Sequence, residues 1–516
     1  MATTKKPAAK TPAAKAAPAK TSAPAPVTEK QSGVAGALNR YFKISERGST
    51  FGTEIRGGLT TFFTMAYIVV LNPLILRTIP DGDGNMLGGE DGGAKIAAVT
   101  ALVAGVLTIM MGIWARFPIA LATGLGLNAF VTFGIAGATG MSWPAAMGLV
   151  VIEGAVILIL VLTGFRTAVF RAVPSFLKKA IAVGIGLFLA FIGLWDSRII
   201  QARPATPSEL GAHGSLNTWP ALVFVIGLLL AILLMVRKVR GALMLSIVGA
   251  TLLAFIIEKV GSIGGYVSPQ LAATLGIPEN PNGWALVVPV APDSVGSAPD
   301  FSLLGKFDFT AFERIGILAA SLFVFSLLLA DFFDTMGTMT AIGAEAGLND
   351  SDGNPPNTKE ILIVDSIAAV AGGAASTSSN TSYIESAAGV GDGARTGFAS
   401  VVTGLAFLLA TFLTPLYSLV PFEAATPVLV IVGFLMVAQV ADIDWKSYEI
   451  AIPAFLTFIL MPFTFSIAVG IGAGFVSYTF IQVIKGKAKG IHLLMWIATI
   501  AFLAYFIREI IAGWIG

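Results

Sequence analysis

The sequence contains no cysteine and only two histidines among its 516 residues. Disulfide bonds, iron–sulfur clusters and thiolate metal sites are therefore excluded, and a histidine-based metal centre is not expected. No glycine-rich segment has the Walker A spacing, and no segment resembles a soluble nucleotide-binding domain, so direct use of ATP is not expected either. We expect no cofactor, no metal site, no catalytic residues and no nucleic-acid partner.

Charged residues are also scarce, at 12% of the chain, whereas 55% of the residues are hydrophobic and the mean hydropathy is +0.83. A soluble protein of this size could not bury so much apolar surface, so membrane lipid must surround part of it. We expect an all-α polytopic protein that crosses the plasma membrane many times.

Apolar runs of about 17–25 residues are candidates for membrane-spanning helices. They lie at 57–76, 95–114, 141–163, 179–195, 219–236, 241–258, 314–336, 360–374, 397–416 and 426–441. The run 448–484 is too long for one helix and contains Pro453 and Pro462, so we interpret it as a hairpin of two. The run 491–511 is either an extra span or a helix on the membrane surface.

The basic residues predict the orientation. Residues 1–37 are rich in Ala, Pro and Lys with few large apolar side chains, which predicts a disordered tail. If this tail is cytoplasmic, alternating spans place most clusters of Lys and Arg on the same side, as the positive-inside rule requires. These clusters are Arg116; Arg166 to Lys179; Arg237 to Arg240; Arg395; Lys446; and Lys485 to Lys489.

Two further apolar segments are interrupted by Gly, Ser, Thr and Asn, at Thr123–Gly134 and Ser376–Gly389. They lie about half a chain apart. Matched interrupted segments in the two halves of a membrane protein indicate the substrate site of a transporter. With them the chain has fourteen membrane segments, arranged as an inverted repeat of seven and seven in which the third and tenth are interrupted.

Acidic residues in apolar segments are costly and are usually functional. Asp331 and Asp334 lie three residues apart in one segment, and Glu385 lies in the second interrupted segment. A desolvated carboxyl group can carry a proton, and an ionised one can accept hydrogen bonds from a flat ligand. The alternative is that these acids bond the backbone of the broken helices and only hold the fold. Asp365 and Glu153 are weaker candidates for the same two roles.

Polar neighbours of these acids are candidate ligand contacts. Asn128 offers both a donor and an acceptor for the edge of a heterocycle, and Gly126 allows close approach of the backbone. Thr381 and Ser382 are candidate lining residues, although Ser and Thr also bond within membrane helices.

Four motifs resemble the azaguanine-type adenine/guanine/hypoxanthine permeases of the nucleobase–ascorbate (xanthine–uracil) transporter superfamily. They are GGLTTFFTMAYIVVLNP (57–73), ATGLGLNAFVTFG (122–134), DFFDTMGTMTAIGAEAGL (331–348) and TSYIESAAGVGDGARTG (381–397). The resemblance covers about residues 38–485. The Gln or Glu followed by Asn that the uracil and xanthine branches carry in segment ten is absent, which favours the purine branch.

The resemblance implies a core and a gate domain, with short extended strands in segments three and ten and the substrate between them and segment eight. The implied divisions are a tail (1–37), core (38–175), gate (176–262), extracellular loop (263–312), core (313–417), gate (418–486) and a C-terminal hydrophobic segment (487–516). By motif, Asp334, Glu385 and Asn128 would face the substrate.

We therefore expect an importer of purine nucleobases (adenine, hypoxanthine, guanine) that uses proton symport and an elevator-like alternating-access mechanism. Asp334, Glu385 and Asp331 are the candidates for carrying the proton. A uracil or xanthine carrier, or an anion exchanger of the same architecture, is the alternative; a membrane enzyme would need a nucleophile–base pair or metal cluster that is not visible. The preferred purine, sodium instead of proton coupling, and the oligomeric state, including a homodimer, stay open.

Overall fold

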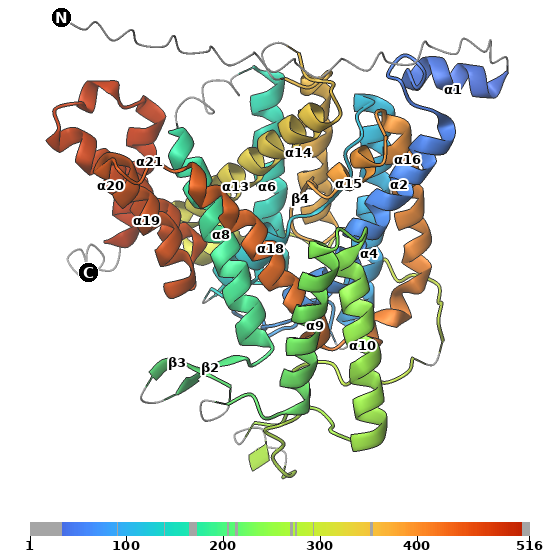
Figure 1. The fold of residues 1–516 in the computed structure, drawn as a ribbon. Coiled ribbons are helices and arrows are strands. Elements are labelled where there is room, and N and C mark those ends of the chain that lie inside the picture. Colours follow the sequence, from blue (N-terminus) through green and yellow to red (C-terminus); the bar gives the residue numbers. More distant parts are fainter. Residues whose placement is uncertain are drawn as a thin grey trace, which may run out of the picture.

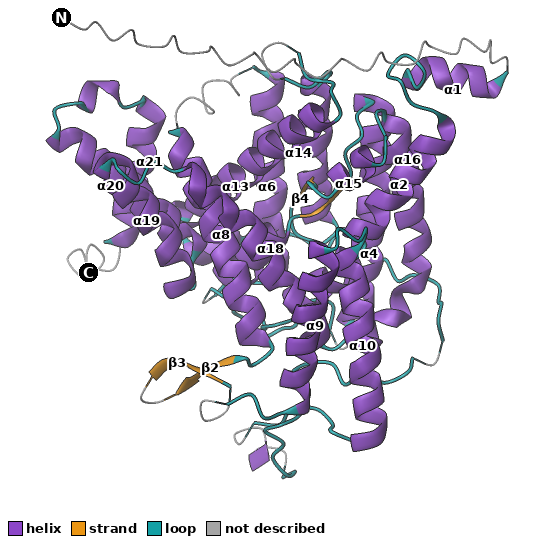
Figure 2. Cartoon of the chain, viewed as in Figure 1, coloured by secondary structure: helices purple, strands orange, loops and turns teal. Residues whose placement is uncertain are grey.

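Helices account for most of the described chain and run between two ends of a bundle (Figures 1 and 2). The structure is a computed structural model. It describes residues 33–507, except 90, 139, 165–172, 204–205, 212–214, 269–271, 274–275, 293 and 351–353. Most of the predicted tail thus lies outside the described residues, and helix α1 (Val34–Phe42) begins within its last part. The end of the bundle at which α1 lies is called the α1 end below.

Ten stretches of the described chain are helical, apolar and long enough to cross a membrane. They are α2 (Phe51–Met65) with α3 (Ile68–Leu76), α4 (Gly92–Met110), α6 (Trp143–Leu162), α8 (Ser175–Asp196), α9 (Trp219–Val236), α10 (Ala242–Gly261), α13 (Ile317–Glu345), α16 (Gly397–Ala410) with the 3-10 helix Thr411–Leu419, α17 (Phe422–Ala425) with α18 (Pro427–Val437) and the 3-10 helix Ala438–Asp442, and α20 (Ile467–Ile484). The chain is therefore an integral membrane protein, as its composition predicts.

The remaining helices are shorter. They are α5 (Leu125–Ala129), α12 (Ala311–Ile315), α14 (Thr358–Ala374), α15 (Ser386–Gly391), α19 (Tyr448–Phe463) and α21 (Leu493–Phe506). The predicted hairpin over 448–484 is confirmed, because α19 and α20 pack against each other. The apolar run near the C-terminus forms α21, which packs against α20 and α13.

One short strand ends where the first interrupted segment begins, and another lies within the second, as the resemblance implies. Strand β1 (Leu121–Thr123) pairs antiparallel with β4 (Asn380–Ser382), with Ala122 opposite Thr381. Figure 2 shows β4 in the middle of the helices. A second pair of strands, the hairpin of β2 (Ile200–Arg203) and β3 (Thr206–Leu210), projects at the end opposite α1 (Figure 1).

Helices α6 and α9 start with the same chemistry, a Ser/Thr–Trp–Pro–Ala sequence. The Ser142 hydroxyl accepts the N–H of Ala145 at 3.4 Å, and the Thr218 hydroxyl accepts the N–H of Ala221 at 3.2 Å. The proline in the first turn has no N–H to leave unpaired. These residues therefore fix where each spanning helix begins.

The helices pack in two groups. In the first group α16 lies against α2 and α4, α14 lies against α6, and the β1–β4 pair contacts α4, α13 and α14. In the second group α8 lies against α18 and α19, α9 against α10, and α19 against α20. The interrupted segments thus belong to the first group, whose helices surround them.

Glycine allows the closest of these contacts. A Cβ atom at Gly404 of α16 would lie 2.5 Å from the carbonyl oxygen of Gly105 on α4, and one at Gly105 would lie 2.9 Å from the carbonyl oxygen of Gly404. A backbone oxygen cannot rotate away as a side chain can. Small residues at such contacts let membrane helices gain dispersion energy along their length.

We predict that Gly404→Ala lowers the free energy of unfolding by about 1–3 kcal/mol, since the added methyl group forces α4 and α16 apart. The measurement is the thermal unfolding midpoint of the purified protein in detergent. Gly52→Ala is the matched control, because a Cβ atom there meets nothing within 4 Å. Equal midpoints for the two variants would contradict the prediction.

Candidate functional site

Where the helices are interrupted, side-chain hydroxyl groups bond the backbone. The N–H of Leu121 donates to Thr108 Oγ1 at 2.9 Å, and the N–H of Ala120 donates to Ser386 Oγ at 3.0 Å. The N–H of Tyr383 donates to the Ala120 oxygen at 3.0 Å. Unpaired backbone groups at membrane depth are too costly to persist. A hydroxyl group from α4 and one from the second interrupted segment therefore allow an extended strand here.

Two of the predicted acids meet beside the strands. Asp334 lies on α13 with an exposed side chain, and Glu385 lies just before α15 and is half-buried. The two carboxyl groups are close enough to interact electrostatically. The hydroxyl group of Tyr67, a buried residue between α2 and α3, donates to Glu385 Oε1. Glu385 is thus held in place from the other side of the site.

Asn128 is buried on α5, directly after β1. Its Nδ2 donates to Thr123 Oγ1 at 3.2 Å, whereas its Oδ1 has no partner among the described residues. A buried amide oxygen without a donor is costly unless a ligand or water supplies one. Gly126 lies at a different contact: a Cβ atom there would be 2.3 Å from Ile185 Cγ2 of α8. Gly126 therefore lets α5 approach the second helix group.

The other predicted site residues turn toward the helices behind β4. Ser382 Oγ donates to Asp365 Oδ1 at 2.9 Å, and Thr381 Oγ1 lies 2.8 Å from Thr335 Oγ1. Asp331 is fully buried. The structure thus divides the predicted residues by their contacts. Asp334 and Glu385 interact with each other, and Asn128 bonds Thr123 at the end of β1, whereas Thr381 and Ser382 contact residues of α13 and α14.

An exposed stripe on α13 leads away from Asp334. Gly337 and Glu345 are exposed at helical spacing from Asp334, whereas residues 326–332 are buried. An exposed carboxylate in a spanning helix cannot face lipid at low cost, so this stripe must border a water-accessible opening. The opening runs toward the C-terminal end of α13, where Glu345 lies beside Gly391.

That end of α13 lies at the α1 end, where polar contacts join the two helix groups. Arg47, just after α1, donates to the Arg395 oxygen at 3.0 Å. Asp392 forms an ion pair with Arg240, which lies between α9 and α10. Asp392 Oδ2 also accepts the hydroxyl of Thr60 on α2 at 2.6 Å. Asp392 is buried, so this contact is shielded more than an ordinary surface ion pair.

Sequence reasoning missed Tyr67 and Lys178. The hydrogen bond of Tyr67 to Glu385 joins positions that no local pattern connects. The ammonium group of Lys178, on α8, lies 4.7 Å from the centroid of the Phe333 ring, next to Asp334. Only the packing of α8 against α13 brings this cation near the site.

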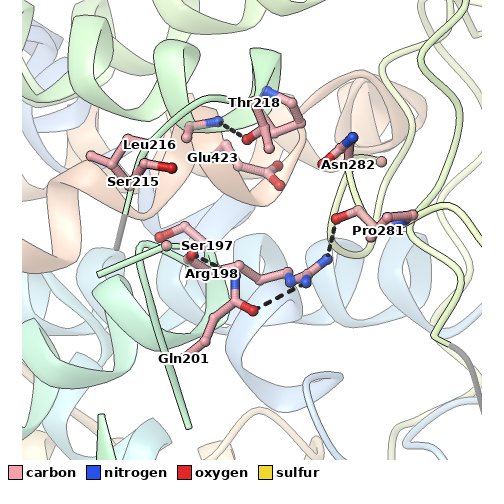
Figure 3. Close-up of a pocket in the computed structure, with 13 residues that line it drawn as sticks. Ser197, Arg198, Gln201, Ser215, Leu216, Thr218, Pro281, Asn282 and Glu423 are labelled. Carbon is pink, nitrogen blue, oxygen red and sulfur yellow. Dashed lines mark hydrogen bonds between the residues drawn. The ribbon is translucent and has the colours of Figure 1, made fainter. Parts of the chain in front are cut away.

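A small cavity lies away from these residues, at the end opposite α1 (Figure 3). Its volume of about 20 Å³ has room for roughly one water molecule. Arg198 donates to the Pro281 oxygen at 3.0 Å, and Glu423 Oε1 accepts the N–H of Ala285 at 2.9 Å. Both contacts attach the long segment after α10 to the second helix group. The residues around this cavity therefore hold that segment in place, and the cavity is too small for a nucleobase.

Comparison with known proteins agrees with the motifs. The permease family (Xan_ur_permease) matches residues 52–509. A guanine/hypoxanthine permease of Bacillus subtilis, PbuG, is 39% identical over 91% of this chain and 99% of its own length. An adenine permease of Escherichia coli, AdeP, is 36% identical over 91% of this chain and 95% of its own.

Solved structures with this fold are more distant in sequence. The transmembrane domain of the cyanobacterial bicarbonate transporter BicA is 13% identical, with a TM-score of 0.52 over 82% of this chain and 97% of that domain. Murine Slc26a9, an anion transporter in an inward-facing state, is also 13% identical, with a TM-score of 0.55 over 84% of this chain and 69% of its own. These likenesses establish a shared fold. The motifs, the matched family and the relatives together establish that this chain belongs to the xanthine/uracil permease family.

Proposed function

We propose that this protein imports purine nucleobases by proton symport through an alternating-access, elevator-like mechanism. The observation that supports this proposal most is the closeness of the Asp334 and Glu385 carboxyl groups beside β4, with the Oδ1 of Asn128, directly after β1, left without a partner among the described residues. The relatives named above are permeases for guanine, hypoxanthine and adenine. A purine that occupies this site would be bound in the middle of the bundle.

The chemistry of the three side chains suits a purine. Adjacent N–H groups on a heterocycle edge can donate to one carboxylate, such as Glu385, because an ionised carboxylate accepts at both oxygens. The unpartnered Oδ1 of Asn128 would accept a further N–H. Asp334, exposed toward the opening along α13, would meet the ligand as it enters or leaves.

Fourteen segments in a seven-plus-seven inverted repeat remain our proposal for the topology. Such a repeat requires contacts in matched pairs, and the observed contacts come in such pairs. The contact of α4 with α16 corresponds to that of α14 with α6, and α2 with α16 corresponds to α13 with α6. Likewise α9 with α10 corresponds to α19 with α20, and α8 with α19 corresponds to α18 with α9.

The two helix groups fit the proposed core and gate domains. In an elevator-like cycle the core, which carries the site, would slide against the gate. The ion pair of Asp392 with Arg240 links the two groups and would have to break during that motion. If the N-terminus is cytoplasmic, as the basic residues predict, the opening along α13 faces the cytoplasm. The plasma membrane is the proposed location, and a homodimer is a further proposal.

The alternatives are a uracil or xanthine carrier and an anion exchanger. The two solved structures are transporters of bicarbonate or other anions, but the likeness concerns the fold alone. Asp334 and Glu385 disfavour an anionic substrate, because like charges repel in a desolvated site. Competition of labelled purine uptake by unlabelled purines, uracil, xanthine and bicarbonate in whole cells separates these functions.

We predict that Glu385→Ala and Asp334→Ala each weaken purine binding roughly ten- to a hundredfold. Each variant removes a charge-assisted hydrogen bond that contributes about 1.5–3 kcal/mol. Binding is measured on purified protein and uptake in cells, with the amount at the membrane quantified. Wild-type affinity and rate in both variants would assign these acids to the fold alone.

Asn128→Ala should change the order of preference among purines more than the maximal rate. The amide reads the edge of the ring without carrying a proton, so its loss affects the purines unequally. Competition by unlabelled adenine, guanine and hypoxanthine measures the order. An unchanged order would remove Asn128 from the proposed contacts.

Purine import should quicken as the external pH falls and should collapse with a protonophore, while replacing sodium should change little. The reason is that a carboxyl group in the membrane interior takes a proton from the more acidic side and releases it on the other. Asp334 and Glu385 can titrate as a pair, with Asp331 as a third candidate. Accumulation that survives a protonophore but requires sodium would overturn proton coupling.

A further inference from the structure

Behind β4, away from the exposed side of Asp334, three acids from three helices lie in the interior. Glu153 is on α6, Asp331 on α13 and Asp365 on α14, and at most 2% of each residue is exposed. No ion pair involving any of them occurs in the part of the chain that the structure describes. Their charge must therefore be offset by hydrogen bonds or by protons.

Asp365 has the hydrogen bonds it needs. Thr335 Oγ1 donates to its Oδ2 at 2.8 Å, and Ser382 Oγ donates to its Oδ1 at 2.9 Å. Each of its oxygens thus receives a hydroxyl group, one from α13 and one from β4. Hydrogen bonds of this kind favour the ionised form of a carboxyl group.

The hydroxyl hydrogens of Thr335 and Thr381 are used in other contacts. A hydroxyl group has one hydrogen to donate. The hydrogen of Thr335 goes to Asp365, so in the pair of Thr335 and Thr381 the donor must be Thr381. Thr381 lies close enough to Asp331 to interact with it, but donating there would leave its 2.8 Å contact with Thr335 without a hydrogen. Neither carboxyl oxygen of Asp331 has a hydrogen-bond donor among the described residues.

One of the two carboxyl oxygens of Glu153 likewise lacks a hydrogen-bond donor among the described residues. Its Oε2 accepts the hydroxyl of Ser379 at 3.2 Å, while its Oε1 has no donor among the described residues. Helices α6 and α13 pack against each other, and across this contact the carboxyl groups of Glu153 and Asp331 are close enough to hydrogen-bond if one of them holds a proton. Two ionised carboxylates this close would repel strongly in a dry interior, and the Ser379 hydroxyl would be their one compensating donor among the described residues.

We propose that Glu153 and Asp331 share one proton across the contact of α6 and α13, and that this pair is a proton-binding site of the transporter. A single proton turns the contact into a hydrogen bond between a carboxylic acid and a carboxylate, as in other carboxyl pairs that share a site. The proton satisfies an oxygen on each residue. Glu153 thereby becomes a functional residue that purine contacts alone would not reveal.

The pair is connected to the substrate side. Ser379, which donates to Glu153, also accepts the N–H of Gly124 on its backbone oxygen at 3.0 Å. The Gly124 oxygen in turn accepts the N–H of Asn128 at 2.8 Å. Loss of the proton would push Glu153 away from Asp331 by charge repulsion. Through Ser379 and Gly124 this movement would disturb the backbone that positions Asn128.

The groups that face the pair are acidic or neutral. On α13 these are Asp334 and Thr335, on α14 Asp365, and on β4 and the residue before it Thr381 and Ser379. Lys178 of α8 lies over the Phe333 ring, next to Asp334 in the chain. The pair therefore titrates among like charges, so its proton should respond to the state of Asp334 and Asp365.

The direct test is infrared spectroscopy of the purified protein in lipid vesicles, which detects the carbonyl band of a protonated carboxyl group. Wild type should show such a band at neutral pH, and Glu153→Gln and Asp331→Asn should each lose it. Because one proton is shared, the double variant should lose no more than either single variant. Glu423→Gln, a change of a buried acid in the second helix group, is the control and should keep the band.

Two results would overturn the proposal. One is a protonated-carboxyl band that none of the pair variants changes, or two separate bands lost independently. The other is a sodium-dependent rise of the thermal unfolding midpoint that both variants abolish, because the pair would then hold a sodium ion.

The role in transport rests on the proposed proton symport and is tested by the pH profile of uptake. Glu153→Gln keeps a neutral side chain at this position and should flatten the rise of purine uptake at acidic external pH, whereas Glu423→Gln should keep it. A Glu153→Gln profile that still follows wild type would remove the pair from coupling. If wild-type uptake itself ignores pH, the proposed symport fails, while the infrared measurement still decides whether the proton is shared.

Discussion

The constraint on which the rest of the structure depends is that every backbone N–H and C=O group at membrane depth must have a partner. An α-helix satisfies this constraint with its own backbone hydrogen bonds. The strands β1 and β4 do not, because each pairs with only one neighbouring strand. The hydroxyl groups of Thr108 and Ser386 supply the missing contacts. A polar strand pair can therefore exist inside an apolar bundle, and the ends of broken helices become available to bind a solute.

Other hydroxyl groups sort the acids by role. Asp365 receives two of them and is bound on both oxygens, so it joins α14 to α13 and β4. Among the described residues, Glu385 has a single hydroxyl donor to its carboxyl group, Tyr67, and Asp334 is exposed to the opening. Acidic residues thus serve the fold, the substrate site or a shared proton according to the hydroxyl donors around them, because each hydroxyl group donates only once.

Much of this arrangement could be predicted from the sequence. The long apolar runs, the hairpin at Pro453 and Pro462 and the two interrupted segments all follow from composition and spacing, because each is a local pattern. The contact of Glu153 with Asp331 and the hydrogen bond of Tyr67 to Glu385 could not be predicted, since they join residues far apart in the chain. At Gly126 the sequence indicates that another part of the molecule approaches the backbone closely. The packing of α5 on α8 shows that this part is Ile185 of α8.

The long segment after α10 is attached to both helix groups. Ala285 is held by Glu423 of the second group, and the N–H of Ser297 donates to the Phe412 oxygen of the first group at 3.0 Å. Twelve residues at full extension span at most about 40 Å. This connection therefore acts as a tether that limits how far the two attachment points can separate. Its entropy, which rises as it slackens, would weakly favour the arrangement in which the two attachment points are closest.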